Sequence, residues 1–195
     1  MLSSSSSLYN SLKEPFTEDM NILATDFYTE ARFSMERLAE LYNKLYGLKI
    51  ICLRNFSIYG PHEKFKENYA NMVSQFLWNI MKNERPTIYG DGNQTRDCVY
   101  VDDAVNAALK ASTYNKKSFD VFNVGTGEAT TFNQIFALLK EKTHSTLEPI
   151  YVKNEIKNYV YNTRADITKA QKELGFVAQV DLKSGVDKLL TYYNL

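Results

Sequence analysis

The chain has 195 residues, which is enough for one domain with a sizeable core, or for one and a half. Its 23 basic and 23 acidic residues give a formal net charge of zero, and no stretch concentrates one sign. The charge pattern therefore indicates neither a nucleic-acid nor an anionic-membrane partner, and no apolar run is long enough to span a bilayer. Small-molecule chemistry is the function class that remains.

The cysteines and histidines indicate the redox compartment of the protein and whether a metal site is expected. Cys52 and Cys98 lie in apolar, strand-like runs, KIICLR and DCVYV, which are typical of buried, reduced thiols. The start of the chain has neither the basic nor the apolar region of a secretory signal, so we expect a soluble protein in a reducing, cytoplasmic compartment. His62 and His144 are far apart and have no acidic or cysteine cluster at ligand spacing, and we expect no metal site.

The first predicted elements are a polar start and a long helix. The serine run MLSSSSSLYN has the composition of a flexible leader. A helix is predicted to begin near Tyr28, with Thr25 or Asp26 as its N-cap and Gly47 as its C-cap. Its apolar residues recur at helical spacing and form one stripe, which consists of Ala31, Met35, Leu38, Tyr42 and Leu45.

A buried strand is predicted after this helix. The continuous apolar run IICL, at residues 50–53, fits a strand that is covered on both faces. A helix with one apolar stripe, a glycine stop and a buried strand make half of a βαβ unit, so we expect an α/β fold with a parallel sheet. Residues 68–83 have the pattern of another amphipathic helix.

The second half of the chain alternates strands and helices in the same way. The run TIYGDGNQTRDCVYV predicts a strand, a turn at GDG and a second strand, after which Asp102 or Asp103 caps a helix. A buried strand, FDVFNV, then enters a glycine loop, and Thr130 or Thr131 caps the next helix. The remaining predicted elements are a strand at 147–152, a short helix at 166–174 that stops at Gly175, and a final helix from about residue 181.

Four separated motifs resemble the extended short-chain dehydrogenase/reductase family. They are SSSSLY, Tyr28 with Arg32, LRNFSIYGP, and GDGNQTRDCVYVDD with FNVGTGE, and they occur in the order and spacing of that family. Within it the chain is most similar to the NAD-dependent nucleotide-sugar epimerases and dehydratases, of which UDP-glucose 4-epimerase is the best known. The resemblance covers essentially the whole chain, and GDGxQTRDxVYVDD is its most specific motif.

The resemblance covers only the second part of the family. Members begin with a nucleotide-binding half, in which a GxxGxxG loop and a helix N-terminus hold the cofactor pyrophosphate, and this sequence has no such motif. We therefore expect the distal part of a Rossmann-type parallel sheet plus a smaller α/β sugar-nucleotide-binding domain. Residues 1–60 are expected to be the Rossmann remnant and residues 61–195 mostly the substrate domain, with residues near 99–128 returning to the sheet.

The resemblance implies that Tyr28 is the catalytic base and that Arg32 is its cation, with both on the cofactor side of the site. A phenol with a pKa of about 10 needs a nearby cation to take a sugar hydroxyl proton at neutral pH, and residues four apart share one helix face. The family has lysine where this chain has Arg32, whose longer planar fork does not reproduce the compact lysine contact to the nicotinamide ribose. By spacing alone, the pair is more often ordinary packing in the first turn of a helix.

Ser5 lies four residues before Tyr9, at the family's position for the hydroxyl that bonds the reacting sugar oxygen, and Ser7 is a candidate to assist it. Dehydratases and decarboxylases of the family usually carry an acidic residue between that serine and the tyrosine. This chain has Ser6, Ser7 and Leu8 there, which favours an epimerase and leaves a nucleotide-sugar dehydratase as an alternative.

Arg96 in QTRD matches the arginine that binds the substrate diphosphate in the family, a contact that suits the bidentate guanidinium group. The alternative for Arg96 is a surface ion pair with Asp97 or Asp102. Asp166 also matches a common acidic position of the family, but N-capping of the following helix explains it.

Further substrate contacts are implied in two other motifs. Thr87, Ile88 and Tyr89 match the short strand that lines the nucleotide base in the family, and Asn68 matches an asparagine near the diphosphate. Ser57 stands where the family commonly has asparagine, and its shorter side chain reaches the phosphates less well.

Together these matches predict an NAD-dependent epimerase of a UDP- or dTDP-sugar, most similar to the UDP-sugar 4-epimerases, which works by hydride abstraction and return through a keto-sugar. We expect little NAD binding by this chain alone. The alternative is a non-catalytic nucleotide-sugar-binding protein, or a subunit that needs a separate cofactor-binding half, because the absent strands would leave a sheet edge open. A homodimer through that edge or through the helix at 28–46 would cover it.

Overall fold

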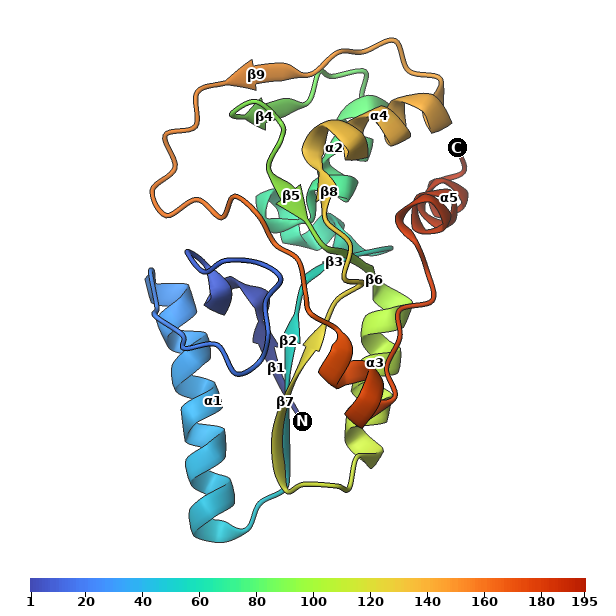
Figure 1. The fold of residues 1–195 in the computed structure, drawn as a ribbon. Coiled ribbons are helices and arrows are strands. Elements are labelled where there is room, and N and C mark those ends of the chain that lie inside the picture. The colour runs from blue at the N-terminus through green and yellow to red at the C-terminus, as the bar shows by residue number, and fades with distance from the viewer.

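A parallel sheet of three strands forms the lower half of the molecule in the computed structural model, which describes residues 1–195 (Figure 1). The strand order is β1 (Leu2–Ser5), β2 (Ile50–Asn55) and β7 (Phe119–Val124). Strand β2 is central and its residues 51–54 are buried, as its continuous apolar run predicts. The predicted α/β fold class with a parallel sheet is confirmed.

Helices cover both faces of this sheet (Figure 1). Helix α1 (Phe27–Tyr46) lies on one face, and α3 (Val101–Thr113) lies on the other together with the short helix η3 (Ala170–Leu174). The core between these layers is built from aliphatic and aromatic side chains, among them Leu53, Val99, Ala107, Phe122 and Phe176. Strand β1 pairs only with β2, so its other edge is open.

The upper half packs helices α2 (Met72–Met81), α4 (Phe132–Thr143) and α5 (Leu182–Tyr193) around a second core, which includes Phe76, Ile88, Ile135, Leu139 and Leu189. Short strands pair here and at the junction of the halves. They are β3 (Ser57–Tyr59) with β6 (Cys98–Tyr100), β4 (Thr87–Tyr89) with β9 (Ile150–Val152), and β5 (Thr95–Arg96) with β8 (Thr130–Thr131). Two short 3-10 helices, η1 (Ser6–Tyr9) and η2 (Glu63–Tyr69), complete the fold. The division of the chain near residue 60 stays a prediction.

Local capping chemistry sets most helix ends as predicted. The Asp26 carboxylate accepts the Thr29 amide at the start of α1, and Gly47 ends that helix with φ of +68°, a conformation that favours glycine. Thr131 and Gln134 form a capping box at the start of α4.

Two sequence expectations are wrong in the structure. Residues 2–5 of the serine run form strand β1, which pairs with β2, and residues 6–9 form η1, so the run is not the flexible leader that its composition suggests. Neither Asp102 nor Asp103 caps α3, which has Tyr100 as its N-cap without a side-chain bond. The Asp103 carboxylate instead accepts the amides of Gln179 and Val180 at 3.0 and 2.9 Å.

Helix α1 has an unusual orientation. The apolar stripe predicted from its sequence faces outward, and Leu38 and Leu45 are 54% and 70% exposed. The face toward the sheet carries Thr29, Glu36 and Ala39, which are the buried residues of this helix. An amphipathic helix normally buries its apolar stripe, so a polar interaction with the sheet must hold α1 in this orientation.

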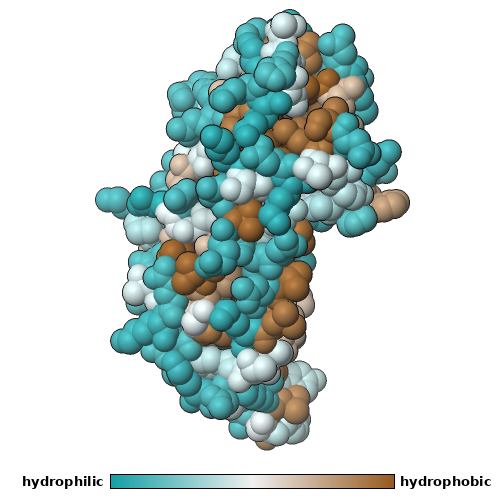
Figure 2. Space-filling view, turned by 90° about the vertical axis from the view of Figure 1, so that its right-hand side faces the viewer, coloured by the Kyte–Doolittle hydropathy of each residue, from teal (hydrophilic) through white to brown (hydrophobic).

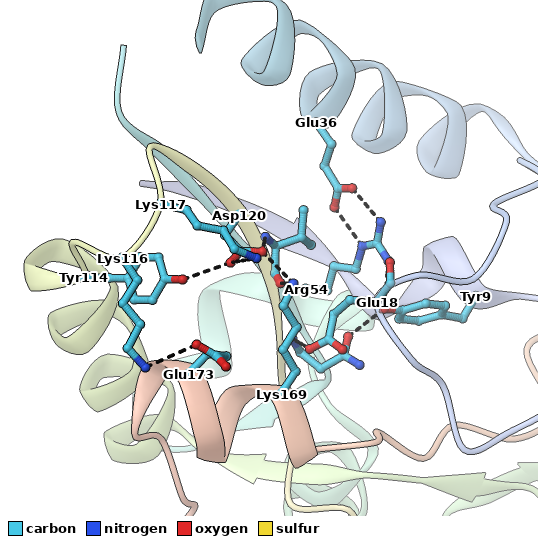
Figure 3. Close-up of polar contacts among 12 residues, drawn as sticks. Tyr9, Glu18, Glu36, Arg54, Tyr114, Lys116, Lys117, Asp120, Lys169 and Glu173 are labelled. Carbon is cyan, nitrogen blue, oxygen red and sulfur yellow. Dashed lines mark hydrogen bonds and ion pairs between the residues drawn. The ribbon is translucent and has the colours of Figure 1, made fainter. Parts of the chain in front are cut away.

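That interaction is a buried ion pair between α1 and β2 (Figure 3). Arg54 donates from Nε and Nη2 to the two carboxylate oxygens of Glu36, at 3.0 and 2.8 Å, and each residue is only 4% exposed. The Nη1 group of Arg54 donates to the Tyr9 hydroxyl and to the Glu18 backbone carbonyl, at 2.8 and 3.2 Å. The Tyr9 hydroxyl in turn donates to Asn123 on β7 at 2.7 Å. This network joins β2 to α1, η1 and β7.

One face of the molecule mixes polar and apolar surface. Figure 2, which views the face of α3 and α5, shows apolar atoms in separate patches between polar ones. None of the helices combines the length and the apolar character that crossing a bilayer requires. Both cysteines are unpaired and buried, and burial raises the pKa of Cys52 and of Cys98 to about 12.

We predict that Glu36→Leu lowers the free energy of unfolding by roughly 3–5 kcal/mol, because it leaves the Arg54 charge buried without its partner. The double variant Glu36→Leu/Arg54→Met should recover most of this loss, and urea denaturation measures both. The matched control is Glu40→Leu on the same helix, which breaks an exposed pair with Lys44 and should cost no more than about 1 kcal/mol. Equal losses from Glu36→Leu and Glu40→Leu would contradict the role given to the buried pair.

Candidate functional site

Arg96, on β5, is a cation without an acidic partner. Its guanidinium carbon lies 5.1 Å from the centre of the Phe132 ring and 5.7 Å from that of Tyr159, so the group is flanked by two aromatic rings. Its two hydrogen bonds, at 2.7 and 3.1 Å, both go from Nη1 to backbone carbonyls, of Thr95 and Tyr161. Burial lowers the pKa of Arg96, and the neighbours that oppose this shift are the Tyr159 phenol and the Cys98 thiol rather than a carboxylate. Nε and Nη2 remain for a ligand.

The surface ion pair considered for Arg96 is not formed. Asp97 is completely buried and its carboxylate faces the interior, where it accepts four hydrogen bonds. Asp102 lies 3.6 Å from Lys188 on α5. The Arg96 charge is therefore left for something other than these two residues.

A cavity of about 780 Å³ opens beside Arg96 in the upper half. Four of the predicted substrate residues line it: Asn68, Thr87, Tyr89 and Arg96. Ile88 does not, because alternate residues of a strand face opposite sides and Ile88 is buried in the core. The volume lies within the range of about 300–1,000 Å³ that is typical of small-molecule sites.

Five aromatic residues of this cavity were missed in the sequence, namely Phe76, Trp78, Phe132, Tyr159 and Tyr193. Trp78 lines it from α2, Phe132 from the start of α4, and Tyr159 from the connection between β9 and η3. The sequence signal for Tyr159 was the run YVY in an otherwise polar connection, where tyrosines have no core to join. Phe132 and Trp78 gave no separate signal, because aromatic residues at helical spacing are usually core.

Two other sequence candidates lie elsewhere. Ser57, on β3, does not line this cavity. Its backbone amide donates to the Asp97 carbonyl and its carbonyl accepts from the Asn71 side chain, so its structural role is in strand pairing. Asp166 accepts the Thr168 amide at 2.8 Å just before η3, but the N-cap of η3 is Lys169, which makes no side-chain cap bond.

The glycine loop after β7 binds the side chain of a buried residue, Asp97. The Asp97 carboxylate accepts the amides of Thr126, Gly127 and Ala165, at 2.7, 3.0 and 3.0 Å, and also the Thr126 hydroxyl. Burial raises the pKa of Asp97, and these hydrogen bonds oppose the shift. A Cβ atom at Gly125 would lie 2.8 Å from the same carboxylate, so glycine is needed for the close approach. The loop amides are thus already engaged.

A second group of predicted residues lies at the end of β1, in the lower half. The Arg32 guanidinium carbon is 5.1 Å from the centre of the Tyr28 ring, and its Nη1 donates to the Ser3 carbonyl at 3.1 Å. Arg32 therefore contacts both Tyr28 and the strand that ends at Ser5. The Tyr28 ring is 53% exposed and is not part of the apolar core.

The serines of this group are held differently from one another. The Ser5 hydroxyl accepts the Ser7 amide at 3.2 Å, which caps η1 and leaves its own proton free to donate. The Ser7 hydroxyl is buried and has no hydrogen-bond partner. The arrangement offers a phenol, a permanent cation and hydroxyl groups, which are the groups that a proton transfer needs.

Comparison with protein families identifies one match. The model of the NAD dependent epimerase/dehydratase family matches residues 1–125. The solved UDP-glucose 4-epimerase of Thermotoga maritima, with UDP-glucose, is 35% identical with a TM-score of 0.92, and the alignment covers 98% of this chain and 62% of that one.

Two further relatives carry related names. The UDP-N-acetylglucosamine 4-epimerase of Methanobrevibacter ruminantium M1, solved in complex with UDP-N-acetylmuramic acid, is 27% identical with a TM-score of 0.88, over 98% of this chain and 62% of that one. The UDP-glucuronate 4-epimerase of Thermodesulfobacterium geofontis is 28% identical over 98% of this chain and 58% of its own length. The chain spans 56–60% of the length of the first three curated relatives it matches.

Proposed function

Because the chain belongs to the NAD dependent epimerase/dehydratase family, we propose that it binds a UDP-sugar and supplies the proton-transfer groups of a UDP-sugar 4-epimerase. The relatives' names include UDP-glucose and UDP-glucuronate 4-epimerases, which supports the reaction class. In the family this reaction would use NAD to take a hydride from the sugar carbinol, which becomes a keto-sugar, and to return it to the opposite face.

The observation that carries this proposal is Arg96. A guanidinium that is flanked by Phe132 and Tyr159, with no carboxylate partner and two free donor groups, is stabilised by an anion entering the adjacent cavity. A diphosphate suits the remaining Nε and Nη2 donors, because guanidinium binds phosphate oxygens in a bidentate way. Thr87 and Tyr89, on the same cavity wall, are then placed to face the nucleoside.

In the proposed chemistry Tyr28 takes the hydroxyl proton from the sugar. The permanent charge of Arg32 lies beside its ring. Ser5 donates its hydroxyl proton to the same sugar oxygen and orients it toward Tyr28. When the hydride returns, Tyr28 gives the proton back, so the residues end as they began.

The residues present do not form a cradle for NAD. Residues 125–127 form the only glycine-rich loop near a helix start. The amides of Thr126 and Gly127 in this loop donate to the Asp97 carboxylate, so they are not available to a pyrophosphate. In the family NAD accepts and returns the hydride. We infer that the nucleotide-binding half of the family is needed for turnover.

A second candidate function is a nucleotide-sugar-binding subunit that pairs with another chain. Two observations favour it. Strand β1 has an open edge, and α1 presents its apolar stripe outward, with Leu38, Tyr42 and Leu45 at least half exposed. The simplest occupant of the α1 face is a second copy of the chain, because a stripe along a 20-residue helix is complementary to itself in an antiparallel arrangement.

We predict that Arg96→Ala weakens binding of UDP-glucose about 10- to 100-fold, because hydrogen bonds from a charged donor contribute roughly 1.5–3 kcal/mol. Tyr28→Phe should leave the dissociation constant nearly unchanged, since the phenol acts on the proton. Calorimetric titration measures both, and fluorescence of Trp78, the single tryptophan, gives a second readout within the cavity. Arg37→Ala, an exposed arginine of α1, is the matched control. Equal losses from Arg96→Ala and Tyr28→Phe would contradict the assigned roles.

We predict that the chain alone binds NAD weakly or not at all, because its glycine loop is occupied by Asp97. Titration of NAD into the purified protein tests this, and UDP-glucose in the same sample shows that the protein is folded. A micromolar dissociation constant for NAD would contradict this prediction and would indicate an enzyme that needs no separate cofactor-binding half.

We predict that the protein sediments as a dimer, at twice its mass of 22.5 kDa. Leu38→Glu should convert it to a monomer, because a charge in the centre of an apolar interface is buried without a partner. Arg37→Glu, the neighbouring exposed position on the polar side of the helix, should leave the dimer intact. Analytical ultracentrifugation distinguishes these outcomes, and a monomeric unmodified protein would exclude the dimer.

A further inference from the structure

The short helix η2 forms one edge of the cavity beside Arg96. Its residues Lys64, Glu67 and Asn68 line the cavity. The side chains of Phe65 and Tyr69 in the same helix do not line it, and each is 93% exposed. Burying an aromatic ring is favourable, because it removes apolar surface from water. A ring at this edge would therefore be stabilised by covering a ligand in the cavity.

Both ends of η2 are fixed to helix α2. At the start of η2, the buried Glu63 carboxylate accepts the hydroxyl proton of Ser74. At its end, the Gln75 side chain donates to the carbonyls of Asn68 and Ala70, at 3.2 and 2.7 Å. These hydrogen bonds hold the two ends of η2 in place relative to α2.

The middle of η2 has no such hydrogen bonds to the rest of the protein. The side chains of Lys64 and Glu67 form no hydrogen bond or ion pair, and Lys66 pairs only with Glu63 of the same helix, at 2.9 Å. Phe65 lies in this middle part. Its ring is therefore not held by the contacts that fix the ends.

The backbone of η2 is strained at one position in this middle part. Glu67 has φ of +48° and ψ of −122°, a conformation that glycine adopts readily and that a side chain disfavours. Strain of this kind is concentrated in segments that clamp ligands or change conformation. A different arrangement of residues 64–67 would relieve it.

We propose that residues 64–67 form a lid, which closes the cavity by laying the Phe65 ring over a bound nucleotide. The inference rests on the proposed function, because that function supplies the nucleotide. Nucleotides present a flat ring that an aromatic side chain covers well. Closing moves Phe65 out of water and relieves the strain at Glu67, while the ends of η2 stay fixed to α2. It needs the ligand, because only the ligand gives Phe65 a surface to pack against.

Stopped-flow mixing of the full chain with UDP-glucose tests the proposal, with the fluorescence of Trp78 in the cavity wall as the signal. The observed rate is plotted against ligand concentration, and the slope gives the association rate and the intercept the dissociation rate. Phe65→Ala should raise the dissociation rate by about 5- to 100-fold, the range expected of one stacked ring. The association rate should stay within about twofold, because the lid closes after the ligand has entered.

Tyr69→Ala is the matched control for this measurement. The Tyr69 ring is as exposed as that of Phe65, but it lies between Asn68 and Ala70, whose carbonyls Gln75 holds. The dissociation rate of Tyr69→Ala should equal that of the unmodified protein. Equal acceleration by the two substitutions would overturn the lid, because the effect would not depend on the free part of η2.

A second pair of variants tests the strain at Glu67. Glu67→Ala removes the carboxylate and keeps the strained backbone, whereas Glu67→Gly removes both. Because the strain is present in the open arrangement, its removal favours that arrangement over the closed one. Glu67→Gly should therefore bind UDP-glucose at least about fivefold more weakly than Glu67→Ala. Equal or tighter binding by Glu67→Gly would overturn the link between the strain and closing.

The outcomes separate this inference from the function on which it rests. If UDP-glucose does not bind to the unmodified protein, the proposed function fails and the inference with it. If UDP-glucose binds and Phe65→Ala releases it at the unmodified rate, the inference alone is overturned. A fixed cavity wall predicts that second result, because Phe65 does not line the cavity in the open arrangement. The substituted side chain is exposed, so the variant keeps the protein core unchanged.

Discussion

The lower half of this protein depends on how the Arg54 guanidinium is buried. A charge in the interior is tolerated only when its donors are paired, and here the Glu36 carboxylate, the Tyr9 hydroxyl and the Glu18 carbonyl provide the acceptors. These partners come from α1, from η1 and from the following loop, while Arg54 itself lies on the central strand. One side chain therefore determines how the helix with Tyr28 and the turn after Ser5 meet the sheet.

The same constraint decides what the protein presents to its surroundings. Since α1 turns Glu36 and other polar residues toward the sheet, the apolar residues of the helix face outward, as Leu38 and Leu45 do. The open edge of β1 belongs to the same half of the molecule. An outward apolar stripe and an unpaired strand edge are both stabilised by association, which is why a partner for this half is part of the proposed function.

Arg54 and Arg96 differ in their hydrogen-bond partners, and this difference decides which of them stabilises the fold and which is available to a ligand. Arg54 has a complete set of protein acceptors and so contributes to the fold. Arg96 is also enclosed by protein, but its neighbours are the rings of Phe132 and Tyr159. Its only acceptors are two backbone carbonyls, and both are bound by Nη1. The side chain borders a cavity of about 780 Å³. Its neighbour Asp97 is turned inward to organise the glycine loop, so the motif QTRD contains one residue for a ligand and one for the fold.

Local sequence by itself determined most of the secondary structure and the types of side chain at the site. The caps at Asp26 and Thr131 and the buried strand at 50–55 depend on neighbours within a few residues or on hydrophobic pattern, and both kinds of information are present in the sequence. The family motifs also led to Arg96, Thr87, Tyr89 and Asn68, which the fold brings to one cavity. Only the tertiary structure decided which face of α1 is buried, that the serine run is a strand, and that Tyr159 joins Arg96. The reason is that Arg54 with Glu36, β1 with β2 and Arg96 with Tyr159 are contacts between distant segments, and neither propensity nor periodicity contains information about such partners.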